Sequence, residues 1–191
     1  MRVAARYWLF QLVRAIVAAA AGIAITLDQD HTAAYGIGMF AAFAIVAGLV
    51  VAAFWFVAGV ADRALWLVQG LLGVAAGVVT LVLHTGGIGA LLYGVSVWAL
   101  LTGAAELVGG WRARRGASEF TISAARDRMV VGAATVVLAI VYLVIPAEHR
   151  LVVGLFGAYA IVLGVYLAIG AFSLRWARPV GAAEQNTESH A

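Results

Sequence analysis

The sequence contains no cysteine, and all twelve of its basic residues are arginine. Without cysteine, a disulfide framework, a thiolate metal site and a cysteine nucleophile are excluded. Charged residues are also scarce, at 11% against about 25% in an average soluble chain. Hydrophobic residues make up 65% of the 191 residues, which is more than a soluble domain of this size can bury. The composition therefore excludes a water-soluble globular protein.

The formal charge of +3 and the pI near 9.7 do not predict nucleic-acid binding. The arginines lie beside hydrophobic runs and form no separate basic domain, which is typical of topology signals. No Ser/His/Asp set and no His-Glu-x-x-His motif is present, and the glycines at 86, 87 and 89 lack the preceding strand and the following lysine of a phosphate-binding loop. We therefore expect neither an enzyme nor a cofactor.

Six apolar runs separated by turn residues predict an all-α polytopic membrane protein with six transmembrane helices. Barrel strands would alternate polar and apolar residues, whereas Leu71 to Leu83 contains almost nothing polar. A cleavable signal peptide is the alternative for the first run, but Arg14 would then lie in the middle of its apolar region. The expected spans are Tyr7 to Leu27, Ala33 to Gly59, Ala64 to Leu83, Ile88 to Trp111, Met129 to Ile145 and Leu151 to Leu174.

The arginines predict the orientation of these spans. Three connections, near residues 28–32, 84–87 and 146–150, are short enough to be the tips of helical hairpins. If Met1 is cytoplasmic, ten arginines fall on its side of the membrane and only Arg150 falls on the other. We therefore expect a multi-pass membrane protein with both termini cytoplasmic, in which residues 1–176 form one domain and residues 177–191 form a disordered tail. Five tryptophans are expected at the cytoplasmic interface, whereas Trp98 should pack within a span, and the five are Trp8, Trp55, Trp66, Trp111 and Trp176.

A shift of 55 residues superposes the first two hairpins without a gap, placing Arg14 on Gln69, and a third copy follows less cleanly. The repeats cover about residues 7–59, 64–111 and 129–174, and they predict three parallel two-helix units in a pseudo-threefold arrangement. Chance coincidence of alanine and glycine is the alternative for the third copy. Small residues four apart allow helices to approach closely. The expected packing residues are Ala44, Gly48, Gly73, Gly77, Ala99, Gly103, Ala160 and Gly164.

These motifs resemble a known family. Residues 67–115, with QGLLGVAAG at 69–77 and WALLTGAAEL at 98–107, resemble the repeated element of the HdeD-like acid-resistance membrane proteins. Arg14 and Pro146 also match, whereas the tips at 28–31 and 84–87 depart from the family's proline pattern. The resemblance extends over about residues 8–174. It implies a protein of the bacterial inner (plasma) membrane that is linked to survival in acid, and no catalytic residues.

Three polar residues inside the spans are expected to meet. A charge at the bilayer centre costs about 2.5–3.5 kcal/mol on insertion scales. Arg14, Gln69 and Glu106 fall at similar depths, on the order of 10 Å inside the cytoplasmic boundary at 1.5 Å per residue. We predict an interhelical cluster of the three. It would lock helices together or form part of a proton or ion pathway, and snorkelling of Arg14 alone to the interface is the third alternative.

The tips of the hairpins carry titratable residues that suggest a response to pH. They are His31, His84 and His149, with Asp28, Asp30 and Glu148. Protonation in acid would reverse the charge of this face from negative to positive. Simple solvation of polar turn residues is the alternative. A metal site is not expected, because the histidines do not occupy equivalent repeat positions.

The expected partner is the lipid bilayer, with anionic headgroups under the arginines of the connection from Arg112 to Arg128, which also contains Phe120 and Ile122. A second copy of the chain and another membrane protein are left open as partners.

Two functions follow from the sequence. The first is a non-enzymatic inner-membrane protein of the HdeD-like type, linked to acid or envelope stress resistance. The second is a small transporter or channel for protons, ions or small solutes that uses the Arg14 and Glu106 layer.

Overall fold

The computed structural model describes residues 2–29, 31–58, 60–116 and 122–176. In these ranges every regular element is a helix and no strand occurs, so the predicted all-α class is confirmed. The long helices are α1 (Arg2–Leu27), α2 (Ala33–Ala53), α3 (Val60–Val82), α4 (Gly87–Arg114), α5 (Ile122–Val144) and α6 (His149–Trp176). Two short 3-10 turns, η1 (Phe54–Phe56) and η2 (His84–Gly86), lie at helix ends.

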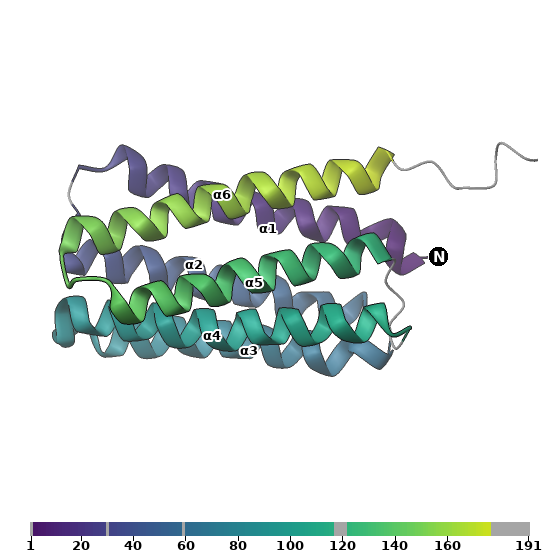
Figure 1. Ribbon diagram of the computed structural model, residues 1–191, viewed down its shortest axis with the longest axis horizontal. Coiled ribbons are helices and arrows are strands. Elements are labelled where there is room, and N and C mark those ends of the chain that lie inside the picture. The colour runs from purple at the N-terminus through teal and green to yellow at the C-terminus, as the bar shows by residue number, and fades with distance from the viewer. Residues whose placement is uncertain (1, 30, 59, 117–121, 177–191) are drawn as a thin grey trace, which may run out of the picture.

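All six long helices within the described ranges are long and apolar enough to cross a bilayer, so the chain is a multi-pass membrane protein (Figure 1).

Local signals mark the helix ends. The hydroxyl of Thr32 accepts a hydrogen bond from the Tyr35 amide at 3.3 Å and caps the start of α2. Beyond the end of α4, Gly116 has a φ of +74°, the left-handed conformation in which helices often end at glycine.

The closest helix pairs are α1 with α6, α2 with α3, and α4 with α5. Each pair joins helices of different hairpins, and the two helices of one hairpin contact each other less. Figure 1 shows α6 running along α1, although these helices come from opposite ends of the described chain. The bundle is therefore closed by contact between its first and last helices.

One glycine in each of α2, α4 and α6 brings two helix backbones together. An added Cβ at these positions would lie within 3.0 Å of a backbone atom of the partner helix, which real Cβ atoms essentially never do. The added Cβ would lie 2.7 Å from the Gly70 carbonyl oxygen at Gly48, 2.9 Å from the Gly132 carbonyl oxygen at Gly103, and 2.8 Å from the Ala19 amide nitrogen at Gly164. Small residues are required here for close approach within lipid.

The other expected packing residues also lie between helices. Ala44, Ala99 and Ala160 are fully buried, one turn from the three close-contact glycines. Gly73 of α3 lies against Gly48 of α2, and Gly77 lies against the backbone of Ala41. The contacts of α2 with α3 thus use small residues from both helices.

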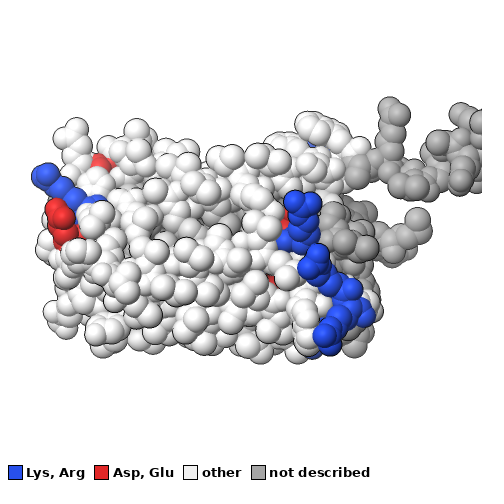
Figure 2. Space-filling model, viewed as in Figure 1, with Lys and Arg blue, Asp and Glu red and all other residues white. Residues whose placement is uncertain are grey.

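Charged side chains lie at the two ends of the bundle, and its middle presents apolar side chains (Figure 2). We call the end with exposed Arg112, Arg114, Arg115, Arg126 and Arg175 the arginine-rich end. The opposite end, with His31, His84 and His149, is the histidine end. The apolar band between them is the surface that contacts the lipid bilayer.

Two predictions at the arginine-rich end are wrong. Helix α5 begins at Ile122 rather than at Met129, so Arg128 belongs to a helix and is only 1% exposed, which excludes contact with lipid headgroups. Trp66 is fully buried rather than interfacial, because its ring packs against the Arg128 guanidinium at 4.1 Å. Asp30, the segment 117–121 and the predicted tail at 177–191 lie outside the described residues.

Candidate functional site: a buried Arg–Glu–Arg cluster beside a central cavity

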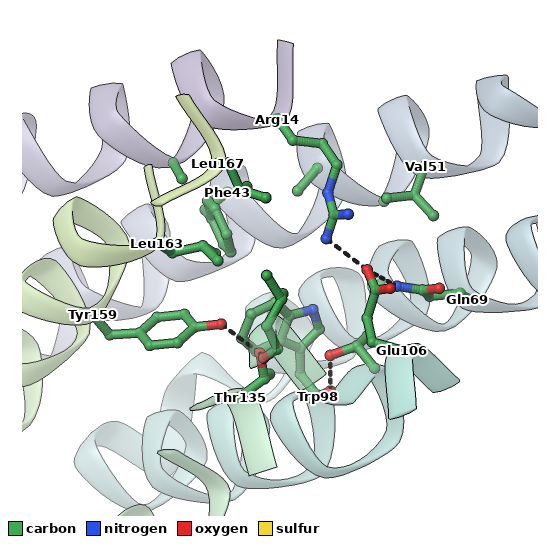
Figure 3. A pocket seen from close by; sticks show the side chains of 16 residues that line it. Arg14, Phe43, Val51, Gln69, Trp98, Glu106, Thr135, Tyr159, Leu163 and Leu167 are labelled. Atoms are coloured by element: carbon green, nitrogen blue, oxygen red, sulfur yellow. Dashed lines mark hydrogen bonds and ion pairs between the residues drawn. The ribbon is translucent and has the colours of Figure 1, made fainter. Parts of the chain in front are cut away.

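Glu106 of α4 joins four helices through its carboxylate, although its side chain is only 2% exposed. Its Oε1 accepts from Arg14 Nη2 of α1 at 2.8 Å and from Gln69 Nε2 of α3 at 3.0 Å. Its Oε2 accepts from Arg128 Nε of α5 at 2.9 Å. Figure 3 shows Arg14 reaching from its helix toward Glu106 and Gln69. The structure thus brings Arg14, Gln69 and Glu106 together, and Arg14 does not snorkel alone.

Sequence reasoning missed the second arginine of this cluster. The sequence places Arg128 in a connection, because charges at the edge of an apolar run usually mark topology. Gly109 makes room for it, because an added Cβ there would collide with the Arg128 guanidinium. The repeat offered a signal, since Arg128 lies one helical turn before Val131, which aligns with Arg14 and Gln69. Arg126 on the same helix is exposed.

A cavity of about 50 Å³ adjoins the cluster, and its lining residues come from equivalent positions of the three sequence repeats. Apart from Gly48, the lining residues form sets of three in which the second member follows the first by 55 residues and the third follows the second by 61 or 62. The sets are Arg14, Gln69 and Val131; Ala18, Gly73 and Thr135; Phe43, Trp98 and Tyr159; Ala47, Thr102 and Leu163; and Val51, Glu106 and Leu167. All six helices therefore contribute equivalent positions to one central space.

The hydroxyl groups that line the cavity donate their hydrogen bonds to acceptors within the protein. Thr135 donates to the Val131 carbonyl at 2.7 Å and lies 2.8 Å from the Tyr159 hydroxyl. Because the single hydroxyl hydrogen of Thr135 is used, Tyr159 must be the donor in their contact (Figure 3). Thr102 donates to the Trp98 carbonyl at 2.6 Å. These three hydroxyls offer only lone pairs to a molecule in the cavity.

Aromatic side chains pack on both sides of the polar layer. Toward the histidine end, the Phe43 ring lies 5.5 Å from Trp98 and 5.4 Å from Phe156, both edge to face. Toward the arginine-rich end, Phe10 stacks on Phe54 at 4.2 Å, and both contact Trp66. The cluster thus lies in a low-dielectric interior, where its electrostatic interactions are stronger than in water.

The residues of the hairpin tips are only partly brought together. His31, Glu148 and His149 line an open depression of about 470 Å³ with Arg150, whereas His84 lies exposed at η2 and does not line it. Asp28 is half-buried beside the first tip. In the described ranges no group of three or more His, Asp or Glu side chains is arranged to hold a metal ion.

Comparison of the chain with protein-family models, curated proteins and solved structures finds no match. The resemblance to the HdeD-like proteins therefore rests on the sequence motifs at residues 67–115. The geometry of the cluster and the cavity is the basis for the function proposed next.

Proposed function

We propose that the protein is a non-enzymatic inner-membrane protein of the HdeD-like type that contributes to resistance against acid or envelope stress. The observation that carries this proposal is the Glu106 cluster. Its carboxylate is fully used in contacts to α1, α3 and α5, so the costliest polar groups of the interior hold helices together. The motifs at 69–77 and 98–107 supply the link to acid stress.

We propose further that the bundle consists of three copies of one two-helix unit around an axis along the membrane normal. Two observations support this arrangement. Gly48, Gly103 and Gly164 make the same kind of close contact in three helix pairs. The cavity is lined by sets of three residues at matching repeat positions. Both features follow directly if three equivalent hairpins surround the cavity.

The orientation with both termini cytoplasmic is supported by the charges at the two ends. Exposed arginines, among them Arg112, Arg114 and Arg115, gather at the end where the described chain begins (Figure 2). Among the arginines of the described ranges, only Arg150 lies at the histidine end. The positive-inside rule then places the arginine-rich end in the cytoplasm, where these side chains are positioned to contact anionic headgroups.

A small transporter or channel for protons, ions or small solutes is the second candidate. It is favoured by one observation, the cavity that Arg14, Gln69 and Glu106 line in the middle of the bundle. Intramembrane ionisable residues that face a cavity often mark ion pathways. The aromatic layer of Phe43, Trp98 and Tyr159 lies between this cavity and the histidine end, which favours a structural role over a continuous path.

Acid survival and proton flux together test the proposal. A host strain that lacks the protein is expected to survive acid or envelope stress less well than its parent, and the wild-type chain should restore survival. Glu106→Leu should fail to restore it, whereas Arg126→Leu, at an exposed arginine of α5 outside the cluster and the tips, serves as the control. Equal survival of the parent and the deletion strain under both stresses would contradict the stress role.

Purified protein in liposomes should leave an imposed pH gradient unchanged relative to protein-free vesicles. Proton flux that disappears in Glu106→Gln would instead establish the transporter.

The residues of the hairpin tips can be tested in the deletion strain, with glutamine at His31, His84 and His149. Unchanged acid survival of this variant would exclude a pH sensor at the histidine end.

A further inference from the structure

The amide of Gln69, which lines the central cavity, is only half used in contacts with the protein. Gln69 is 4% exposed, and its Nε2 donates to Glu106 Oε1 at 3.0 Å. Its Oε1 has no hydrogen-bond partner among the described residues. Buried polar groups normally find a partner in the protein or in an ordered water molecule. This oxygen therefore favours a bound species that carries a hydrogen-bond donor.

Three hydroxyl oxygens in the lining of the same cavity are acceptors as well. Thr102 and Thr135 donate their hydrogens to backbone carbonyls, and Tyr159 donates its hydrogen to Thr135. Each of these oxygens keeps at least one lone pair for another donor. Arg14 and Trp98, which also line the cavity, carry N–H donors. A molecule that suits this lining must both donate and accept hydrogen bonds.

The size and the charges of the cavity restrict what it can bind. A water molecule needs about 10–15 Å³ of comparable space, so a volume of about 50 Å³ has room for only a few atoms heavier than hydrogen. Arg14 and Glu106 both line the space, so an ion of either sign would lie beside a like charge. Water is neutral, is small enough, and both donates and accepts hydrogen bonds.

We propose that the central cavity is an internal hydration site that binds a cluster of about three to five water molecules, at about 10–15 Å³ each. One water donates to Gln69 Oε1, and its neighbours donate to the hydroxyl oxygens across the cavity. The water cluster completes the hydrogen bonds of the polar layer that direct contacts between the helices leave unfilled. This site does not depend on the proposed stress function, because it rests only on the acceptors, charges and volume of the interior.

Hydroxyl-radical footprinting of the purified full-length chain in detergent micelles tests the site. X-ray irradiation turns bound water into radicals that oxidise the side chains next to it, including buried ones. Trp98 and Phe43 line the cavity, whereas Trp66 and Phe40 are buried and do not line it. We expect Trp98 to be oxidised several times faster than Trp66, and Phe43 several times faster than Phe40. Equal rates in either pair would overturn the proposal, because residues of one type have the same intrinsic reactivity.

Gln69→Leu tests the part of the amide oxygen in holding the water. This change removes the acceptor and should lower the oxidation rate of Trp98 several-fold. Gln11→Leu is the matched control and should leave that rate unchanged, because Gln11 is 2% exposed and also has an unpartnered Oε1, but it does not line the cavity. Equal oxidation of Trp98 in the two variants would contradict a site at Gln69. If Gln69→Leu does not fold, the two pairs in the wild-type chain decide the proposal on their own.

Discussion

Replacing Glu106 with leucine is expected to lower the free energy of unfolding by about 3–5 kcal/mol. The reason is electrostatic. Without the carboxylate, the guanidinium groups of Arg14 and Arg128 lose the partner that they contact at 2.8 and 2.9 Å, and Arg128 remains buried. The side chain of leucine fills similar space, so loss of packing contributes little.

The measurement is reversible unfolding of the purified protein in mixed detergent micelles, followed by helix content. Glu148→Leu is the matched control, because Glu148 is an exposed acid at a hairpin tip, and surface changes of this kind usually alter stability by about 0.5 kcal/mol or less. An equal effect of the two leucine variants would show that the cluster contributes nothing to stability.

Adding one methyl group at a close-contact glycine is expected to destabilise the bundle by about 1–3 kcal/mol. The variants are Gly48→Ala, Gly103→Ala and Gly164→Ala. In each case the new Cβ would meet backbone atoms of the neighbouring helix at less than 3.0 Å, and backbone cannot move aside as a flexible side chain can. The two helices of each pair must then separate along their contact.

Each of these helices provides its own control. Gly38 of α2, Gly89 of α4 and Gly154 of α6 have no atom within 4 Å of an added Cβ. Alanine at these positions should leave stability unchanged or raise it by up to about 1 kcal/mol, because alanine favours the helix more than glycine does. The same unfolding assay applies. If each close-contact variant matches its open-position control, the helix pairs do not depend on these glycines.

The helices and the polar layer could be predicted because they depend on patterns inside single segments. Apolar runs of sufficient length define spans, and the mean hydropathy of a run does not depend on its neighbours. Arg14, Gln69 and Glu106 were recognisable because a charged or amide group inside such a run is costly and must find a partner at its own depth. Their contacts in the structure follow from that rule.

Arg128 could not be recognised in this way, because its burial depends on three other segments. The start of α5 at Ile122 draws it into the bundle, Gly109 leaves space for its guanidinium, and the Trp66 ring covers it. None of these contacts is visible in the residues next to Arg128, which resemble an ordinary positively charged helix end. The pairing of α1 with α6 likewise depends on closure of the whole bundle.

The most direct test of the central cluster is a complete set of leucine substitutions at Arg14, Glu106 and Arg128, with the free energy of unfolding measured for every single, double and triple variant. Because Glu106 contacts both arginines, the double variant Arg14→Leu with Glu106→Leu still leaves Arg128 buried without its partner and should remain destabilised. The triple variant should recover stability to within about 1–2 kcal/mol of the wild type, since a buried ionic group can often be replaced by packed apolar residues. Additive losses, with the triple variant the least stable of all, would contradict a cluster in which the three side chains act together.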